Sequence, residues 1–359
     1  MTIQDIINIV EEAVPLYRQE EWDNSGYQVV PPSGVKATCT GVVLALEANV
    51  AVLEEAVAKG CNLVITHHPL IFKGLKKLTG ANDAQRTVAF ALCNGIAVYS
   101  THTALDSAPG GVSAQMAKLL GADVQRPLAP RRNAMVKLSV SCPRDDRDAV
   151  ESILLDSGVA SCTSSDAERI VASVDSDTLT YSLDGTPVSK IEIVDDEPVV
   201  LMLYRRLRTA PNAFSWKFNI EPLRNDSCDS GLGVVASFPE AVPAHTLVER
   251  IKEVFGCSVI RSSAGYNADA MIHRVALCGG SGGEFISVAL AAGAQVYITA
   301  DVRYHDFVDS ANMAMAIFDI GHFESEKCFK TIIYNIITNK LPNFAVYYAD
   351  LETNPVKYL

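Results

Sequence analysis

Histidines and carboxylates gather in three short motifs of this chain. The motifs are Thr-His-His-Pro at 66–69, His-Thr-Ala-Leu-Asp at 102–106 and Gly-His-Phe-Glu-Ser-Glu at 321–326. Imidazole and carboxylate ligands without a thiolate suit borderline or hard divalent ions such as Zn, Mn, Fe, Co or Ni. Two histidines with shared carboxylates suffice for a two-metal site, so the motifs predict metal-assisted hydrolysis at a centre that both ends of the chain build.

Each motif follows an apolar run that is typical of a buried strand, at 61–66, 96–101 and 317–320. Parallel strands in α/β proteins place ligand sites at their carboxyl ends, so the three motifs are expected at one edge. Residues 322 and 326 share one helix face if a helix starts at the preceding glycine. The side chains expected to converge are His67, His68, His102, Asp106, His322 and Glu326.

The elements around these motifs predict an α/β fold. Apolar strand-like runs alternate with helix-like stretches up to residue 120, and the alternation resumes after residue 273. This pattern indicates mostly parallel, layered sheets with crossover helices, formed by both ends of the chain. An amphipathic helix is expected over 3–16, with Thr2 as its cap.

The sequence pattern changes in the middle of the chain. Two prolines and three arginines in 126–133 predict a linker. Beyond it, a strand is expected at 135–141, a helix at 144–157 and one or two strands over 191–204, before a loop-rich stretch at 225–233. We interpret 132–225 as an inserted small α+β domain, with 1–131 and 226–359 together forming the metal-binding α/β domain.

Composition limits the functions that this site could serve. A chain of 359 residues is long for one core, and its net charge of -12 argues against general nucleic-acid binding. The nine cysteines include no CxxC pair, which is typical of reduced thiols. No apolar run reaches the roughly 18 residues of a spanning helix. These features predict a cytoplasmic protein without membrane association, for which a small molecule is a possible substrate.

Two features have a structural and a functional interpretation. The glycine-rich run 278–283 could bind a phosphate on its backbone amides, or it could be a tight packing turn, since it lacks a GK[ST] ending. Lys73, Lys76 and Lys77 could clamp a substrate or form a solvated loop.

Four polar residues are candidates for the outer shell of the centre or for substrate contact. Asp301 and His305 follow another strand, but they could equally be an N-cap and a surface histidine. Asp23 and Asn24 lie beside Trp22, in what could also be a turn with an anchoring aromatic ring.

Taken together, these motifs resemble the dinuclear-metal Nif-three-like family, whose members are often labelled GTP cyclohydrolase I type 2 homologues. The resemblance covers about 1–125 and 230–359. The strings that carry it are 22–26, 66–72, 102–106 with 109–111, 279–282, 299–301 with 304–305, and 321–322 with 325–326. Ala104 and Glu47 depart from the family pattern, which has Asn and Asp there.

The resemblance implies two divalent metal ions per chain, with His102 beside them. It also implies a homo-oligomer, commonly a toroidal hexamer, and an inserted domain of ferredoxin-like type in the middle region. The ligands that it implies are His67, His68, Asp106, His322 and Glu326.

We therefore predict a two-metal hydrolase of a nucleotide or phosphoester-type small molecule, with His102 as its proton shuttle. Ring opening of a purine nucleotide would suit the same chemistry. The alternative is a non-enzymatic, metal-stabilised ring that binds a metabolite or a protein partner in a regulatory role. Fold and metal site alone do not fix the reaction.

Overall fold

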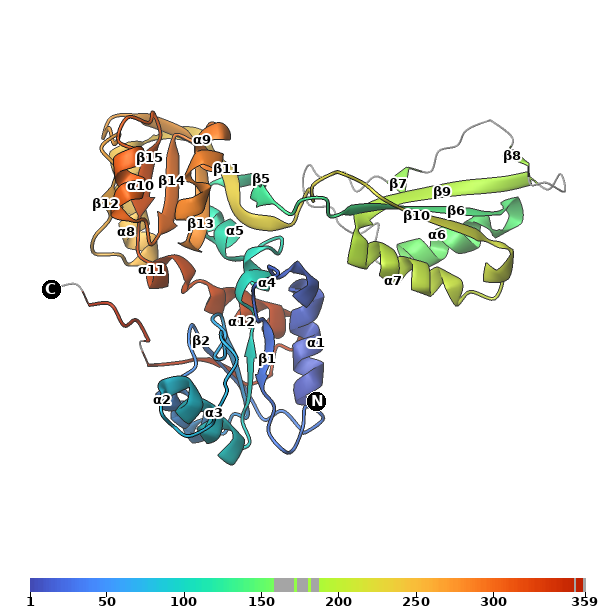
Figure 1. Cartoon of the computed structure of the whole chain (residues 1–359), viewed down its shortest axis with the longest axis horizontal. Helices are drawn as coiled ribbons and strands as arrows, with labels where there is room; N and C mark the ends of the chain where they lie inside the picture. The colour runs from blue at the N-terminus through green and yellow to red at the C-terminus, as the bar shows by residue number, and fades with distance from the viewer. Residues whose placement is uncertain (158–170, 173–179, 182–186, 352, 358–359) are drawn as a thin grey trace. The chain divides into compact units, whose positions relative to one another are not determined.

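The computed structural model describes residues 1–157, 171–172, 180–181, 187–351 and 353–357. The chain divides into two compact units, which we call the main unit (Met1–Ala129 with Ser230–Leu359) and the inserted unit (Pro130–Asp229). Figure 1 labels most of their helices and strands. In the part of the chain that the structure describes, no helix combines the length and the apolar character needed to cross a membrane.

The first sheet of the main unit carries two of the three motifs at one edge. Its strand order is β1-β4-β3-β2-β16, with β4, β3, β2 and β16 parallel and β1 antiparallel to β4. The three central strands are buried along their whole length, as expected for parallel strands covered on both faces. The bounds are β1 Gly26–Val29, β2 Val42–Ala45, β3 Leu63–Thr66, β4 Ala97–Ser100 and β16 Val346–Tyr348.

Helices cover both faces of this sheet. Alternate strand residues divide between two cores, so α1 (Ile3–Ala13) and α12 (Phe329–Lys340) pack on one face and α2 (Val50–Ala58) and α3 (Asp83–Cys93) on the other. Helix α1 begins as predicted, because the Thr2 hydroxyl accepts from the Asp5 amide at 3.2 Å and the Asp5 carboxylate accepts from the Thr2 amide at 2.8 Å. Such a cap contributes about 1 kcal/mol.

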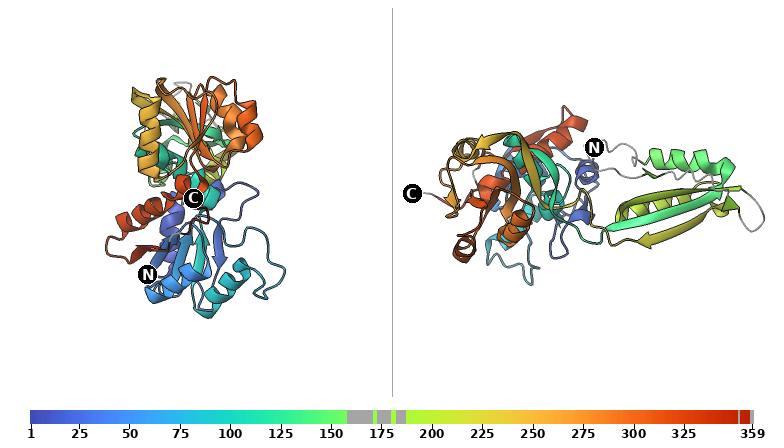
Figure 2. Two further views of the ribbon diagram at one scale, coloured as in Figure 1. Left: turned by 90° about the vertical axis from the view of Figure 1, so that its left-hand side faces the viewer. Right: turned by 90° about the horizontal axis from the view of Figure 1, so that it is seen from above.

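The second sheet has the order β12-β15-β14-β13-β11-β5, with a parallel centre of β13, β14 and β15. Helices α5 (Val112–Leu119) and α8 (Ala244–Phe255) share one core with it, and α9 (Ile286–Ala291) contributes to the core on its other face. Figure 2 shows α8 and α9 on opposite sides of these strands. The bounds are β5 Asp123–Pro130, β11 Gly231–Pro243, β12 Arg261–Ser262, β13 Met271–Ser281, β14 Val296–Ala300 and β15 Ala316–Asp319.

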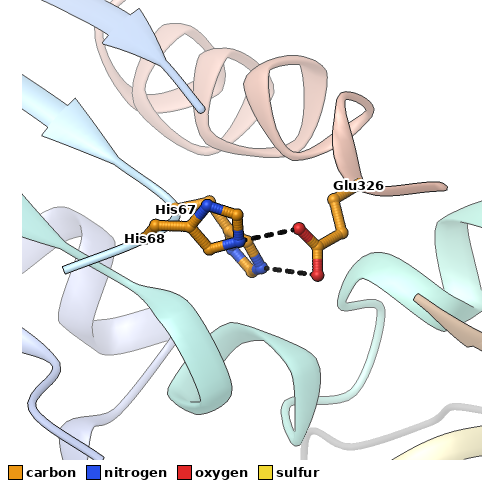
Figure 3. A group of neighbouring side chains, drawn as sticks. All are labelled: His67, His68 and Glu326. Carbon is orange, nitrogen blue, oxygen red and sulfur yellow. Dashed lines mark ion pairs between the residues drawn. The ribbon is translucent and has the colours of Figure 1, made fainter. Parts of the chain in front are cut away.

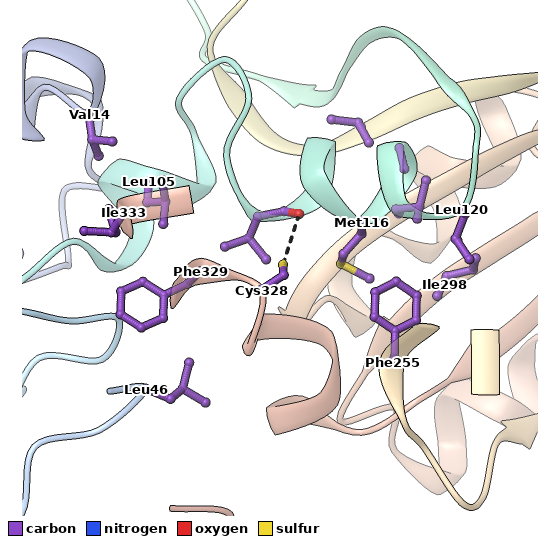
Figure 4. Close-up of a cluster of buried hydrophobic side chains, with 14 of the residues drawn as sticks. Val14, Leu46, Leu105, Met116, Leu120, Phe255, Ile298, Cys328, Phe329 and Ile333 are labelled. Carbon is purple, nitrogen blue, oxygen red and sulfur yellow. Dashed lines mark hydrogen bonds between the residues drawn. The ribbon is translucent and has the colours of Figure 1, made fainter. Parts of the chain in front are cut away.

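One apolar core joins the two sheets of the main unit. It contains side chains from α1 and α12 as well as from α5, α8 and β14. In Figure 4, Phe329 and Ile333 lie on the side of the first sheet, and Phe255 and Ile298 on the side of the second. The short helices α4 (His102–Asp106), α10 (Tyr304–Asp309) and α11 (His322–Glu326) carry candidate site residues. The predicted mixed α/β fold with layered sheets is confirmed.

The inserted unit is an antiparallel sheet with two helices in its core. The strand order is β10-β6-β9-β7, and β8 also pairs with β9. Helices α6 and α7 contribute Val150, Leu203 and Leu207 to the apolar core beside the strands. The bounds are β6 Met135–Pro143, α6 Arg147–Leu155, β7 Val171–Ala172, β8 Thr180–Tyr181, β9 Pro187–Asp196, α7 Glu197–Arg208 and β10 Lys217–Pro222.

Two predictions about the middle region are wrong. The expected linker 126–133 overlaps β5, whose prolines are tolerated because β5 is an edge strand and need not donate every backbone hydrogen bond. The expected strands over 191–204 end at Asp196, where α7 begins with Pro198 in its first turn. Buried Val200, Leu203 and Leu207 recur there at helical spacing, and this periodicity overrides the β-branched composition.

Candidate metal centre

The His67–His68 pair is fixed by the strands on either side of it. The hydroxyl of Ser100, at the end of β4, and the amide of His102, at the start of α4, donate to the carbonyl of His67 at 2.6 and 2.9 Å. The amide of His68 donates to the carbonyl of Leu46, beyond β2, at 3.0 Å. The backbone of the pair is therefore held at the carboxyl edge of the sheet, as the strand-end argument predicts.

Glu326 lies against both histidines of the pair. Its Oε1 is 3.6 Å from Nε2 of His67, and its Oε2 is 2.9 Å from Nε2 of His68 (Figure 3). Helix α11 also carries His322, whose Nε2 is 3.1 Å from the same Oε2. Ligand atoms of His67, His68 and Glu326 all lie within 4.8 Å of one another, so these three residues could hold a metal ion.

Asp106 joins the group from the end of α4. Its Oδ2 lies 3.7 Å from Nε2 of His67, too far for a hydrogen bond. Its Oδ1 and both ring nitrogens of His67 are buried and have no hydrogen-bond partner among the described residues. Such unpartnered buried groups are costly unless another ligand satisfies them, so the donor set fits a cation.

Charges within the group are arranged to favour a cation. Burial lowers the pKa of His67 to about 4, so its imidazole is neutral at pH 7 and can act as a ligand. Burial, together with repulsion from Glu326, raises the pKa of Asp106 well above its usual range. Two carboxylates that each have a buried oxygen, beside one neutral imidazole, would be stabilised by a divalent ion.

The other two histidines carry protons in the metal-free protein. Burial lowers the pKa of His68, but hydrogen bonds to Glu326 and Glu47 outweigh it and raise the pKa to about 9. For His322, burial is likewise outweighed by Asp301 and Glu326, and the pKa rises to about 10. A metal ion that binds these imidazoles must therefore displace protons.

Two outer carboxylates orient these histidines. Asp301 lies 2.7 Å from Nδ1 of His322, and Glu47 lies 3.1 Å from Nδ1 of His68, which leaves each Nε2 directed toward Glu326. A carboxylate on the second ring nitrogen is the usual support of a metal-binding histidine. Sequence reasoning singled out Asp301 but missed the role of Glu47. The signal was available, because Glu47 follows β2 at the same edge as the histidine pair.

His102 belongs to a separate hydrogen-bonded group beside the centre. Its ring centroid lies 5.6 Å from those of both His67 and His68, and its Nδ1 lies 2.6 Å from Asp23 Oδ1. The other Asp23 oxygen accepts from the amide and hydroxyl of Thr103 and from the hydroxyl of Ser25. Although burial raises the pKa of Asp23, these hydrogen bonds lower it far below its usual range.

Backbone strain marks both sides of the centre. His102 and Asp301 are two of the three non-glycine residues with positive φ in the described chain, at 26° and 53°. Each stands just beyond a parallel strand, and each side chain takes part in a histidine–carboxylate pair. Such conformations cost about 1–3 kcal/mol each and persist where the surrounding structure demands them.

Two of the sequence-predicted outer residues lie apart from the histidine–carboxylate group. Asn24 donates through Nδ2 to the carbonyl of Ile71 at 2.7 Å. His305 is exposed on α10, and its ring packs edge-on to Tyr304. Within the described residues, neither side chain makes a hydrogen bond or ion pair with the group.

The glycine-rich run serves as a packing element. It begins inside β13, and the amides of Gly279 and Gly280 donate to the hydroxyls of Ser113 and Ser325 at 3.1 and 2.9 Å. A Cβ at either glycine would overlap a neighbouring side chain. These two amides are therefore engaged within the protein, which disfavours the phosphate-cradle interpretation.

Comparison with known proteins agrees with this geometry. Residues 1–355 match the model of the family described as Duf34/NIF3 (NGG1p interacting factor 3). The chain belongs to the Duf34/NIF3 family. The resemblance inferred from the motifs is thereby confirmed, and it extends over nearly the whole chain.

Relatives and solved structures of the NIF3 family match over all or most of their length. A GTP cyclohydrolase 1 type 2 homolog of Staphylococcus aureus is 26% identical, with 100% of each chain covered. NIF3-like protein 1 of Bos taurus is 28% identical over 96% of this chain and 88% of its own length. The crystal structure of a Bacillus cereus protein related to NIF3 superposes with a TM-score of 0.80 at 25% identity, covering 100% of this chain and 99% of that one.

Proposed function

We propose that this NIF3-family protein is a metal-dependent hydrolase with two divalent ions per chain, acting on a nucleotide or phosphoester-type small molecule. The observation that carries the proposal is His67, fully buried with both ring nitrogens unpartnered and facing the carboxylates of Asp106 and Glu326. Relatives in Staphylococcus aureus and Bacillus subtilis are named GTP cyclohydrolase 1 type 2 homologs, and that name points toward nucleotide chemistry.

The ligand set divides between the two oxygens of Glu326. His67 and Asp106 would hold one ion with Oε1, and His68 and His322 would hold the other with Oε2. Ligand atoms about 2.1 Å from a common ion lie roughly 3.0–3.5 Å apart, close to the separations observed here. When bound, such ions lower the pKa of water and polarise the oxygen of a scissile bond.

The site is open on the side from which a substrate would come. The exposed fraction of the side chain rises from 0% for His67 to 20% for His68 and 36% for His322. Three protein ligands per ion would leave coordination positions free, whereas structural sites close their shell with protein groups. Both features favour catalysis over a purely structural role.

His102 is suited to move a proton beside this opening. Because Asp23 accepts a hydrogen bond at Nδ1, the neutral imidazole keeps its proton there and leaves Nε2 free to accept one. General acid–base assistance of this kind contributes about 10²–10⁴-fold to rate. Asp23 acts as a positioning residue, since it fixes the tautomer through His102.

The experiment that tests the proposal combines metal analysis with a turnover screen. Metal content would be measured by plasma mass spectrometry on untagged wild type, His68→Ala and His305→Ala, and each would be assayed on nucleotides and phosphoesters with the ion found. The exposed His305 is the matched control, because its removal should change neither metal content nor turnover.

We expect about two ions per chain, fewer in His68→Ala, and turnover that falls with them. Two ions without turnover would favour the non-enzymatic ring that binds a metabolite or protein. The homo-oligomer implied by the family, a hexamer, is part of the proposal, and light scattering on the same samples tests it. Absence of bound metal after reconstitution would refute the centre itself.

A further inference from the structure

Two exposed aromatic rings stand beside the proposed proton shuttle. The side chains of Trp22 and Phe72 are 60% and 51% exposed, although large aromatic side chains are normally buried. Their ring centroids lie 6.1 Å apart, and they lie 6.0 and 6.2 Å from that of His102. The three rings therefore form one cluster that reaches from solvent to the edge of the metal centre.

Hydrogen bonds hold the two segments that carry these rings together. Asn24 Nδ2 donates to the carbonyl of Ile71 at 2.7 Å, and the amide of Ile71 donates to Gln28 Oε1 at 3.0 Å. Gln28 Nε2 also donates to the carbonyl of Asn24 at 2.6 Å. A surface that is braced before it binds loses little conformational entropy on binding. Asn24 is not among the candidate metal ligands, and these hydrogen bonds indicate that it instead helps to hold the two aromatic segments together.

Three cations follow the second ring along the chain. Lys73, Lys76 and Lys77 are exposed, and within the described residues none of them forms an ion pair. Three such cations close together in the chain would attract an anion such as a phosphate. Lysine is depleted at the cores of protein interfaces, so this composition suits a small phosphorylated ligand better than a second copy of the chain.

We propose that Trp22 and Phe72 form the binding surface for the planar base of a nucleotide, with Lys73, Lys76 and Lys77 binding its phosphate. This inference rests on the proposed function and narrows its substrate class from phosphoesters in general to nucleotides. Stacking of a base on an aromatic side chain contributes about 1–3 kcal/mol and tolerates different bases. Because the rings adjoin His102, a base bound there lies beside the metal centre.

Fluorescence measures this binding directly. The chain has two tryptophans, and Trp216 is buried in the inserted unit, so Trp216→Phe leaves Trp22 as the sole tryptophan reporter. AMP, GMP, CMP and UMP would be titrated into this metal-loaded variant, with ribose 5-phosphate as the probe that lacks a base. We expect saturable quenching by at least one nucleotide and none by ribose 5-phosphate.

Calorimetry would measure the binding affinities of alanine variants made in the wild-type background. Trp22→Ala and Phe72→Ala should each weaken nucleotide binding by roughly 5- to 150-fold, the range that corresponds to the stacking energy. Their affinity for ribose 5-phosphate should be unchanged. Phe214→Ala, which removes a 90% exposed ring from the inserted unit, is the control and should bind as wild type does. Replacing the three lysines with alanine should weaken the binding of both the nucleotide and ribose 5-phosphate.

The outcomes separate this inference from the proposed function. Quenching without hydrolysis would support the nucleotide site and count against the hydrolase. Hydrolysis of phosphoesters with no quenching by any of the four nucleotides would overturn the nucleotide site alone. A smaller assembly mass for Trp22→Ala by light scattering would also overturn it, because the ring would then be a contact between copies. The quenching test does not depend on whether the alanine variants fold.

Discussion

Gly280 and Glu326 are in a contact that leaves no room for a side chain at position 280. A Cβ built on Gly280 would overlap Oε1 of Glu326, and the glycine also has a φ of +65°. The same glycine amide donates to Ser325, the neighbour of Glu326 on α11. The backbone of β13 therefore helps to set the place of the carboxylate that faces His67 and His68.

Gly280→Ala should lower metal affinity. The new methyl group must displace the Glu326 carboxylate, which is buried and cannot swing into solvent. Gly60→Ala is the matched control, because Gly60 has a φ of +70° and open space around it. Both variants carry the strain of a left-handed alanine, about 1–2 kcal/mol, and both should melt at a lower temperature. Only Gly280→Ala should lose bound metal, and equal metal content in the two would contradict the contact argument.

Glu326→Gln should lower metal affinity more than a substitution of Glu47 or Asp301, the carboxylates that orient the histidines. Glu326 is the carboxylate within reach of three histidines, and the amide removes its charge. Loss of an outer partner alone costs about 10–100-fold in metal affinity, so loss of this ligand should cost at least that much.

The control for Glu326→Gln is Glu324→Gln on the same short helix. Glu324 is also buried, but its Oε1 accepts from Asn354, and glutamine keeps that acceptor. Competition titrations with a chelator would measure both affinities. Similar losses in the two variants would mean that α11 was disturbed as a whole, and would remove the case for Glu326 as a ligand.

The arrangement of the centre was largely predictable because its strands are short, apolar and buried. The expected strands at 61–66, 96–101 and 317–320 correspond to β3, β4 and β15, within two residues at each end. Parallel strands leave their carboxyl ends at a shared edge, which is why motifs far apart in sequence meet. The place of Glu47 after β2 put it at the same edge as the histidine pair, but its position in the sequence did not show that its partner is His68.

The edges of the sheets were not predictable in the same way. β5, an edge strand, contains prolines, and its inner neighbour β11 runs from Gly231 to Pro243 through a stretch expected to begin as a loop. Edge strands tolerate residues that would weaken a central strand, and pairing with a neighbouring strand can stabilise a segment whose residues have low β propensity. The chain after the third motif forms two helices, α11 and α12, and the first of them ends at Glu326, the carboxylate that faces the histidines.

Metal affinity should rise with pH through the alkaline range. In the metal-free protein the raised pKa values of His68, about 9, and His322, about 10, mean that both imidazoles are protonated at pH 7. Their ion pairs stabilise the metal-free fold fully below the unfolded pKa of about 6.5, and this stability is lost as pH rises through 9 to 10. A metal ion competes with these protons, so it binds more tightly as they leave.

The metal-induced increase in melting temperature should accordingly be larger at pH 8.5 than at pH 6.5, at equal free metal. Calorimetric titrations in buffers of different ionisation enthalpy should record at least two protons released per chain at pH 7. His68→Gln should release about one fewer. A melting shift independent of pH would rule out histidine ligands that are protonated in the metal-free state.

Asp23→Asn should reverse the tautomer of His102 and abolish its use as a base. The asparagine can keep its carbonyl toward Thr103 and Ser25, which donate to Asp23 Oδ2, and so present its amide group to Nδ1 of His102. The ring must then carry its proton on Nε2, where it can no longer accept one. Turnover should fall by about 10²–10⁴-fold while metal content stays at the wild-type level.

Nitrogen NMR of His102 gives a readout of this tautomer that does not depend on activity. Wild type should show a protonated Nδ1, and Asp23→Asn a protonated Nε2. Ser25→Ala is the control, because it removes one hydrogen bond to Asp23 and leaves the contact with His102 in place. If Asp23→Asn switched the tautomer but turned over at the wild-type rate, His102 would not be the proton carrier. Its contact with Trp22 and Phe72 would then be its main contribution to the site.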